Sequence, residues 1–172
     1  MVKVFISYRR ADTSGYSGRL YHDLKERIGG EIFMDIDSIP AAADFIEVIE
    51  SYVSSCDVLI ALIGRNWLKV TDKSGNRRLD DAKDFVRLEI STALKGGKIV
   101  VPILVQGAEM PLKDDLPEDL QPITRRNAVD ISDHRWYYDL DRLVEVVKAE
   151  YVEGGLVRAT LKSTLEKMQA VT

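Results

Sequence analysis

The sequence predicts an α/β protein built on a five-stranded parallel sheet, and three observations support that prediction. Short apolar runs alternate with amphipathic stretches along the chain. The most apolar run, residues 57–63 (DVLIALI), has the length of a strand that is buried on both faces. Glycine pairs at 29–30 and 96–97 follow amphipathic stretches and end them as helices. Such strand–helix repetition places helices on both faces of a parallel sheet.

The elements follow one another in a regular order. We expect strands over residues 2–7, 31–34, 57–63, 99–105 and 127–131. The intervening helices are marked by apolar residues at helical spacing, namely Tyr16, Leu20, Leu24 and Ile28, then Phe45, Ile49 and Val53, then Phe85, Leu88 and Ile90, and finally Leu140, Leu143, Val147 and Tyr151. Residues 35–43, 66–81 and 110–122 are predicted loops. With right-handed crossovers, five such strands indicate the flavodoxin-like order 2-1-3-4-5.

The length of 172 residues favours one main domain with its own hydrophobic core. We expect that domain to cover residues 1–152. Gly154 and Gly155 then suggest a flexible break. Residues 153–172 are therefore predicted to form a separate helical extension, or a linker to a further domain such as a sensor.

Composition excludes several classes of function. The net charge of −4 argues against nucleic acid as a partner, because phosphate binding needs a basic face. Cys56 is the single cysteine, so no internal disulfide can form, as is usual in a reducing cytoplasm. No apolar run reaches the length of a membrane span, and the start of the chain is too short for a signal peptide. We expect a cytoplasmic protein without a membrane partner.

Standard cofactor and catalytic signatures are missing from the sequence. It contains no phosphate-binding G-x-x-x-x-G-K-[ST] loop, no dinucleotide-binding G-x-G-x-x-G and no G-x-S-x-G elbow. Two histidines, His22 and His134, make a zinc site or a histidine triad improbable. Asp35 and Asp37 alone do not make a metal site. We therefore expect no metal and no bound cofactor, and the remaining catalytic candidates are carboxylates.

The first strand runs directly into a polar sequence, VFISYRR. In open parallel sheets, ligands bind beyond the carboxyl ends of the strands, where the strand order reverses. This rule places Ser7, Tyr8, Arg9 and Arg10 beside the expected crevice. Guanidiniums suit phosphates and can stack on rings, but a loop after a strand is often charged for solvation alone. Composition leaves both interpretations of the arginine pair open.

Glu89 is the most informative carboxylate. Phe85 lies four residues earlier, so both side chains share one helical face. A carboxylate and a ring on one face could hold a sugar and its heterocycle, and could stabilise the positive charge that develops as a glycosidic bond breaks. From spacing alone, a surface carboxylate paired with Arg87 or Lys95 is the simpler interpretation. Trp67, just past the central strand, could be a core residue or a wall of the crevice.

Taken together, these motifs resemble the TIR (Toll/interleukin-1 receptor) domain, of the bacterial, NAD-consuming type. The resemblance covers about residues 2–150. VFISYRR resembles the first-strand box, IFMDIDSIPAAADF the second strand with the BB loop, CDVLIALIGRNWL the third strand and its exit, and KDFVRLEISTAL the helix with the catalytic glutamate. IVVPILV resembles the fourth strand.

The resemblance implies a specific activity and specific residues. It implies cleavage of NAD⁺, as substrate rather than cofactor, to nicotinamide and ADP-ribose or a cyclic isomer, with Glu89 as the catalytic residue. The implied substrate-binding residues are Phe5, Ile6, Tyr8, Arg9, Arg10, Trp67 and Phe85. It further implies activation by self-association through the BB loop, here represented by Asp37, Ile39, Pro40, Ala42 and Asp44. Many bacterial members act in antiphage defence.

Two positions depart from the family pattern. Phe85 stands where members commonly carry tryptophan, so a stacking ring is kept but the indole N–H is lost. The BB loop has Pro40 followed by alanines instead of glycine, which predicts a stiffer or differently shaped tip. This loop keeps open an alternative function, a non-catalytic adaptor that acts through TIR–TIR contacts. A phosphoreceiver domain of the same fold would need an acidic pair after the first strand, where Ser7 and Tyr8 stand.

Overall fold

The computed structural model describes residues 1–34 and 44–169, with side chains described up to residue 156. Its five strands are β1 (Lys3–Tyr8), β2 (Glu31–Met34), β3 (Val58–Ile63), β4 (Ile99–Leu104) and β5 (Val129–Asp130). They form one parallel sheet in the order β2-β1-β3-β4-β5, which confirms the predicted topology. β5 is shorter than expected and pairs only with Ile103 and Leu104.

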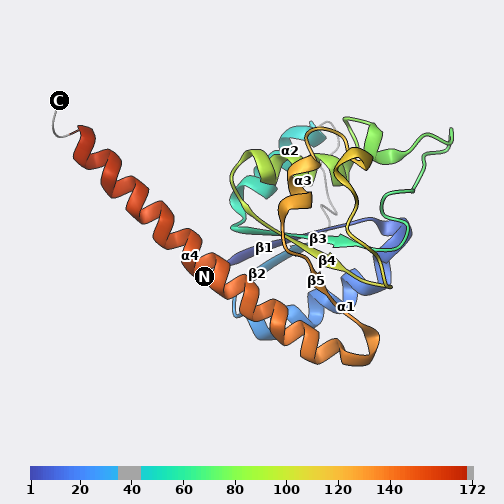
Figure 1. Cartoon of the computed structure of the whole chain (residues 1–172), viewed down its shortest axis with the longest axis horizontal. Helices are drawn as coiled ribbons and strands as arrows, with labels where there is room; N and C mark the ends of the chain where they lie inside the picture. Colours follow the sequence, from blue (N-terminus) through green and yellow to red (C-terminus); the bar gives the residue numbers. More distant parts are fainter. Residues whose placement is uncertain (35–43, 170–172) are drawn as a thin grey trace.

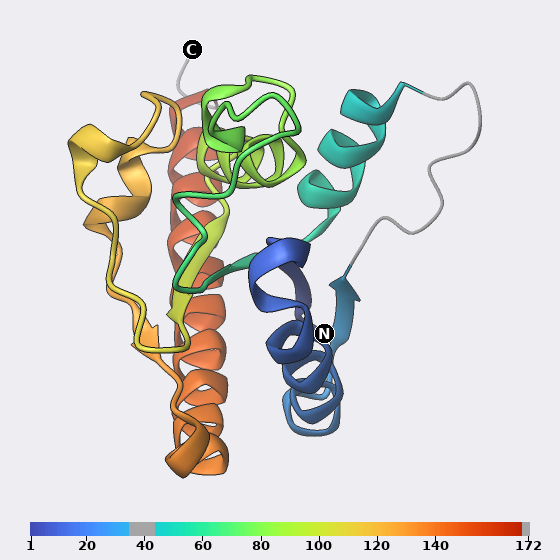
Figure 2. The same ribbon diagram turned by 90° about the vertical axis from the view of Figure 1, so that its right-hand side faces the viewer.

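Helices cover both faces of the sheet (Figure 1). α1 (Arg10–Ile28) and α4 (Trp136–Gln169) lie on one face, and α2 (Phe45–Ser55) and α3 (Phe85–Lys95) lie on the other. Figure 2 shows the same two layers after a quarter turn, with α2 and α3 above the strands and α1 below them. Each face has its own hydrophobic core cluster, because side chains alternate between the faces along each strand.

Local sequence explains where the helices begin and end. Asp44 caps α2 by accepting a hydrogen bond from the Ile46 backbone N–H at 2.9 Å. Asp84 caps α3 by accepting one from the Arg87 N–H at 3.1 Å. Gly29 ends α1 in the left-handed conformation, with a φ of 65°, which glycine adopts without steric cost.

The carboxyl-terminal segment differs from its prediction. α4 runs without interruption from Trp136 to Gln169, through the glycine pair that was expected to break it, and its last turns extend away from the sheet (Figure 1). A Cβ on Gly154 would lie 3.3 Å from the Ile99 Cδ1 atom. At this position glycine therefore permits close packing of α4 against β4. The division of the chain at residues 152 and 153 stays a prediction.

Two further expectations concern the core and the membrane. Cys56 is fully buried, as expected of a small core side chain, and burial raises the pKa of its thiol to about 11. Within residues 1–34 and 44–169, no helix combines the length and the apolarity needed to cross a bilayer.

Candidate functional site

Glu89 lies on α3 and faces the carboxyl end of β1. Its carboxylate oxygen Oε2 accepts a hydrogen bond from the Ser7 hydroxyl at 2.6 Å. Ser7 is buried and Glu89 is half-buried, so the hydrogen bond lies at the boundary between the core and the surface. A short hydrogen bond to a charged acceptor is stronger than one between neutral groups, and it fixes the direction of the carboxylate.

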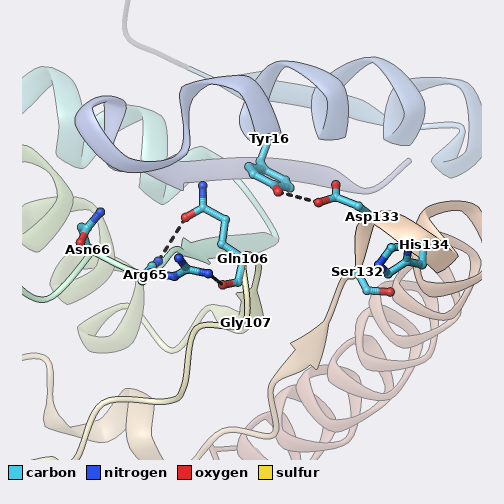
Figure 3. A pocket seen from close by; sticks show the side chains of 8 residues that line it. All are labelled: Tyr16, Arg65, Asn66, Gln106, Gly107, Ser132, Asp133 and His134. Carbon is cyan, nitrogen blue, oxygen red and sulfur yellow. Dashed lines mark hydrogen bonds between the residues drawn. The ribbon is translucent and has the colours of Figure 1, made fainter.

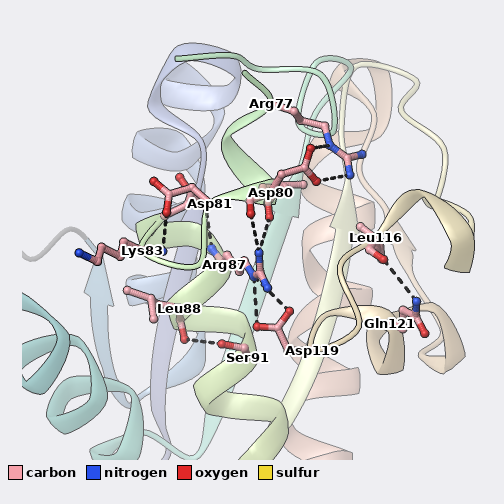
Figure 4. A network of polar contacts seen from close by, with 12 residues as sticks. Arg77, Asp80, Asp81, Lys83, Arg87, Leu88, Ser91, Leu116, Asp119 and Gln121 are labelled. Atoms are coloured by element: carbon pink, nitrogen blue, oxygen red, sulfur yellow. Dashed lines mark hydrogen bonds and ion pairs between the residues drawn. The ribbon is translucent and has the colours of Figure 1, made fainter. Parts of the chain in front are cut away.

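Arg87, one of the basic residues that could pair with Glu89, is engaged elsewhere. The Arg87 guanidinium donates to both carboxylate oxygens of Asp119 at 3.1 Å, and to the carbonyl oxygens of Leu79 and Asp80. Figure 4 shows Arg87 turned towards Asp80 and Asp119, within a network that joins α3 to the loops on either side of it. Arg87 therefore does not form the surface ion pair with Glu89 that spacing alone suggests.

An aromatic surface lies one helical turn from Glu89. Phe85 is 45% exposed, although it begins a helix whose other apolar residues pack inward. The Phe45 ring, from the start of α2, lies beside it with 5.2 Å between ring centroids and 36° between ring planes. Two adjacent rings near a carboxylate can hold a flat heterocycle by stacking.

Arg9 has a different role from the predicted one. Its side chain is buried, and its two terminal nitrogens donate to the two carboxylate oxygens of Asp84 at 2.6 and 2.8 Å. Asp84 is the cap of α3, and its carboxylate also lies 3.3 Å from the Arg78 Nε atom. Arg9 therefore joins the end of β1 to the start of the helix that carries Glu89. In this conformation it offers no surface to a ligand.

The other predicted binding residues separate into two groups. Phe5, Ile6 and Trp67 are each 1% exposed, so as the structure stands they cannot line a crevice. Strand alternation explains the first two, because Phe5 packs under α2 and α3 while Ile6 packs on the opposite face. Tyr8, Arg10 and Phe85 keep exposed surface, and Arg10 is the first residue of α1 instead of a loop residue.

The predicted BB-loop residues are described only at one end. Asp44 is exposed and caps α2. Asp37, Ile39, Pro40 and Ala42 lie outside the described residues. Among the side chains that the structure does describe, no three histidine, cysteine, aspartate or glutamate residues gather as a metal site would require.

The sequence assigned no role to three residues of the site, although it placed Ser7 beside the expected crevice. Ser7 shares the strand face of Phe5 and is polar, which is a signal available from alternation. Asp84 directly precedes a periodic helix, which is the usual position of a cap. Phe45 carries no signal of its own, because only the packing of α2 against α3 brings it to Phe85.

Comparison with known proteins adds independent information. A family model for the TIR domain matches residues 4–144. Over 99% of its length the chain is 26% identical to NAD(+) hydrolase tir-1 of Caenorhabditis elegans, and over 88% it is 29% identical to NAD(+) hydrolase SARM1 of Danio rerio. It spans 16% and 19% of the lengths of these relatives.

A solved structure shows the same fold. The TIR domains of the activated Roq1 resistosome, which directly recognizes the pathogen effector XopQ, superimpose with a TM-score of 0.58 at 14% sequence identity. The match covers 87% of this chain and 99% of that chain.

Proposed function

Because this chain belongs to the TIR-domain family, we propose that it cleaves the bond between nicotinamide and ribose in NAD⁺, with Glu89 as the catalytic residue. The observation that carries the proposal is the Glu89 carboxylate, held by Ser7 at 2.6 Å and one helical turn from the exposed Phe85 ring. The relatives tir-1 and SARM1, which are NAD(+) hydrolases, support it at 26% and 29% identity.

The reaction needs little more than a positioned negative charge. The nicotinamide ring of NAD⁺ carries a positive charge and leaves as a neutral molecule, so positive charge moves to the ribose. A carboxylate beside that carbon stabilises the developing cation. Attack by water on this ribose carbon then gives ADP-ribose and a proton. Attack by a nitrogen of the adenine at the other end of the same dinucleotide gives a cyclic isomer instead. Phe85 and Phe45 would hold a ring of the dinucleotide.

Nicotinamide release from NAD⁺ tests the proposal directly. We expect release that rises more steeply than linearly with protein concentration, because the proposed activity depends on self-association. Chromatography of the products then distinguishes ADP-ribose from a cyclic isomer. Absence of release from assembled protein would contradict the proposal and favour the adaptor function. A role in antiphage defence and a sensor domain beyond this chain stay predictions.

Ser7 provides a test of how Glu89 is held. We expect Ser7→Ala to lower kcat at least about tenfold, because a hydrogen bond to a charged group contributes about 1.5–3 kcal/mol, while KM changes little. Ser7→Thr keeps the hydroxyl and suits a strand, so it should recover most of the lost rate. Initial rates over a range of NAD⁺ concentrations measure both constants. An alanine variant with the kcat of the unmodified protein would remove Ser7 from this role.

A basic groove supports the proposed self-association. It has a volume of about 500 Å³ and runs along the starts of β4 and β5 and along α4, with Arg125, Arg126 and Arg142 in its lining. None of these three guanidiniums forms a hydrogen bond or ion pair with any residue that the structure describes. The BB-loop sequence is acidic, with Asp35, Asp37 and Asp44. Opposite charges of this kind select and orient partners, so we propose that the groove receives the BB loop of a neighbouring copy.

Charge reversal in the groove tests this contact. We expect the double variant Arg126→Glu, Arg142→Glu to weaken self-association at least about tenfold, because like charges across an interface cost several kcal/mol. Sedimentation velocity measures the assembled fraction. Lys69→Glu together with Lys73→Glu, on exposed side chains elsewhere, is the control for the same added negative charge. Assembly that is equal in the double variant and the control would exclude the groove as the acceptor.

A further inference from the structure

A cleft lies at the edge of the sheet where the strands end, apart from Glu89. It has a volume of about 620 Å³ and contains residues that follow β3, β4 and β5, together with Tyr16 of α1. Figure 3 shows its lining, which consists of Tyr16, Arg65, Asn66, Gln106, Gly107, Ser132, Asp133 and His134. None of the residues that surround Glu89 belongs to this set. The cleft is therefore a separate candidate binding site, and its role does not depend on the proposed function.

The wall formed by the β3 and β4 exits is held in a defined shape. Gln106 and Gly107 form a tight turn with φ values of 59° and 68°, closed by the Ala108 N–H and the Val105 carbonyl oxygen at 3.0 Å. A non-glycine residue with such a φ costs of the order of 1 kcal/mol or more. Two hydrogen bonds from Arg65 offset this cost. The Gln106 side-chain oxygen Oε1 accepts from the Arg65 backbone N–H at 3.3 Å, and the Gln106 backbone carbonyl oxygen accepts from the Arg65 guanidinium at 2.9 Å.

Arg65 is thereby held with part of its guanidinium unused. Among the residues that the structure describes, the guanidinium donates only through Nη2, which leaves Nε and Nη1 for a ligand. Across the cleft, the His134 imidazole forms no hydrogen bond or ion pair within the described part of the chain. A guanidinium with two unused donors fits the geometry of a phosphate, and a nearby imidazole adds a further donor.

The one carboxylate in the cleft is already engaged. Asp133 accepts from the Tyr16 hydroxyl at 2.9 Å and lies 4.0 Å from the Arg19 guanidinium. The hydrogen bond to Asp133 raises the pKa of Tyr16, so the phenol stays a neutral donor. Because Arg19 offsets the charge of Asp133, Arg65 dominates the field that an incoming ligand meets.

The cleft is much larger than a phosphate ion. Its volume of about 620 Å³ is in the range of pockets that hold whole small molecules. The Tyr16 ring and the Asn66 amide supply an apolar and a polar surface for the rest of such a molecule. We propose that this cleft binds a phosphate-bearing ligand of mononucleotide size, with Arg65 as the phosphate-binding residue and His134 beside it.

Calorimetric titration of the whole chain with AMP, inorganic phosphate and adenosine tests the ligand class. AMP is expected to bind more tightly than either fragment. Arg65→Gln should raise the Kd for AMP at least about tenfold, because it removes a charge-assisted pair. Lys73→Gln, which removes one positive charge from an exposed side chain outside the cleft, and Glu89→Gln should both leave that Kd within about twofold. Phosphate that binds as tightly as AMP would overturn the size assignment.

Histidine resonances give a second readout that does not rely on the Arg65 variant. The chain has two histidines, and His22 lies on α1 outside the cleft. AMP is expected to shift the His134 imidazole signals and to leave those of His22 in place, with His22→Gln providing the assignment. AMP binding that is lost in Glu89→Gln or Lys73→Gln, or that leaves His134 unshifted, would place the ligand elsewhere and overturn the proposal. Absence of AMP binding would overturn it as well.

Discussion

Replacement of Glu89 by glutamine is expected to slow nicotinamide release from NAD⁺ at least about 100-fold. Charged groups that act on the transition state typically contribute factors of this size or larger. Glutamine has nearly the same shape as glutamate, and its carbonyl oxygen can still accept the hydrogen bond from Ser7. The substitution therefore removes the charge that would stabilise the ribose cation and keeps the packing of α3.

The matched control is the same substitution at another glutamate, far from the proposed site. Glu145 is exposed on α4, on the other face of the sheet, so Glu145→Gln should leave the rate unchanged. Urea unfolding of both variants shows whether the fold is retained, and initial rates at saturating NAD⁺ show the loss. A Glu89→Gln protein with the rate of the Glu145→Gln protein would leave the TIR fold without its proposed catalytic residue.

Most of the fold could be predicted because it depends on local patterns. The run 57–63 predicts a central strand, and all residues of β3 are indeed buried. The pair Phe85 and Glu89 is four residues apart, so any helix brings it to one face. Glycine pairs were less reliable. Gly29 does end α1, whereas Gly154 packs against Ile99, and the sequence gives no indication of that distant neighbour.

The candidate site was harder to predict because its contacts join distant parts of the chain. Arg9 follows a strand in the manner of a ligand-binding residue, but its partner Asp84 lies 75 positions away. Trp67 was compatible with a core or a crevice position, and only the packed structure shows its burial. Ser7 and Glu89 are 82 positions apart, and the packing of α3 against the sheet brings them together. Periodicity identifies the face of an element and not the partner of a side chain.

The buried pair of Arg9 and Asp84 leads to the largest expected effect on stability. Asp84→Asn should lower the free energy of unfolding by about 3–5 kcal/mol, because it leaves the Arg9 charge buried without its counterion. Asparagine is as good a helix cap as aspartate, so the cap of α3 is kept. The Arg9 side chain is 2% exposed, and its Nε atom already has no hydrogen-bond partner among the described residues, so water cannot compensate for the loss.

Urea unfolding measures this loss, and the chain offers a matched surface pair. The Arg27 Nε and Asp141 Oδ1 atoms lie 3.1 Å apart, and the two side chains are 29% and 66% exposed. Asp141→Asn should therefore lower the free energy of unfolding by less than about 1 kcal/mol. The double variant Arg9→Met, Asp84→Asn removes the unpaired charge and should regain much of the stability lost in Asp84→Asn. A double variant no more stable than Asp84→Asn would show that the cost does not arise from the buried charge. Because the Arg9–Asp84 pair joins the end of β1 to the start of the helix that carries Glu89, the double variant should still release nicotinamide more slowly than the unmodified protein.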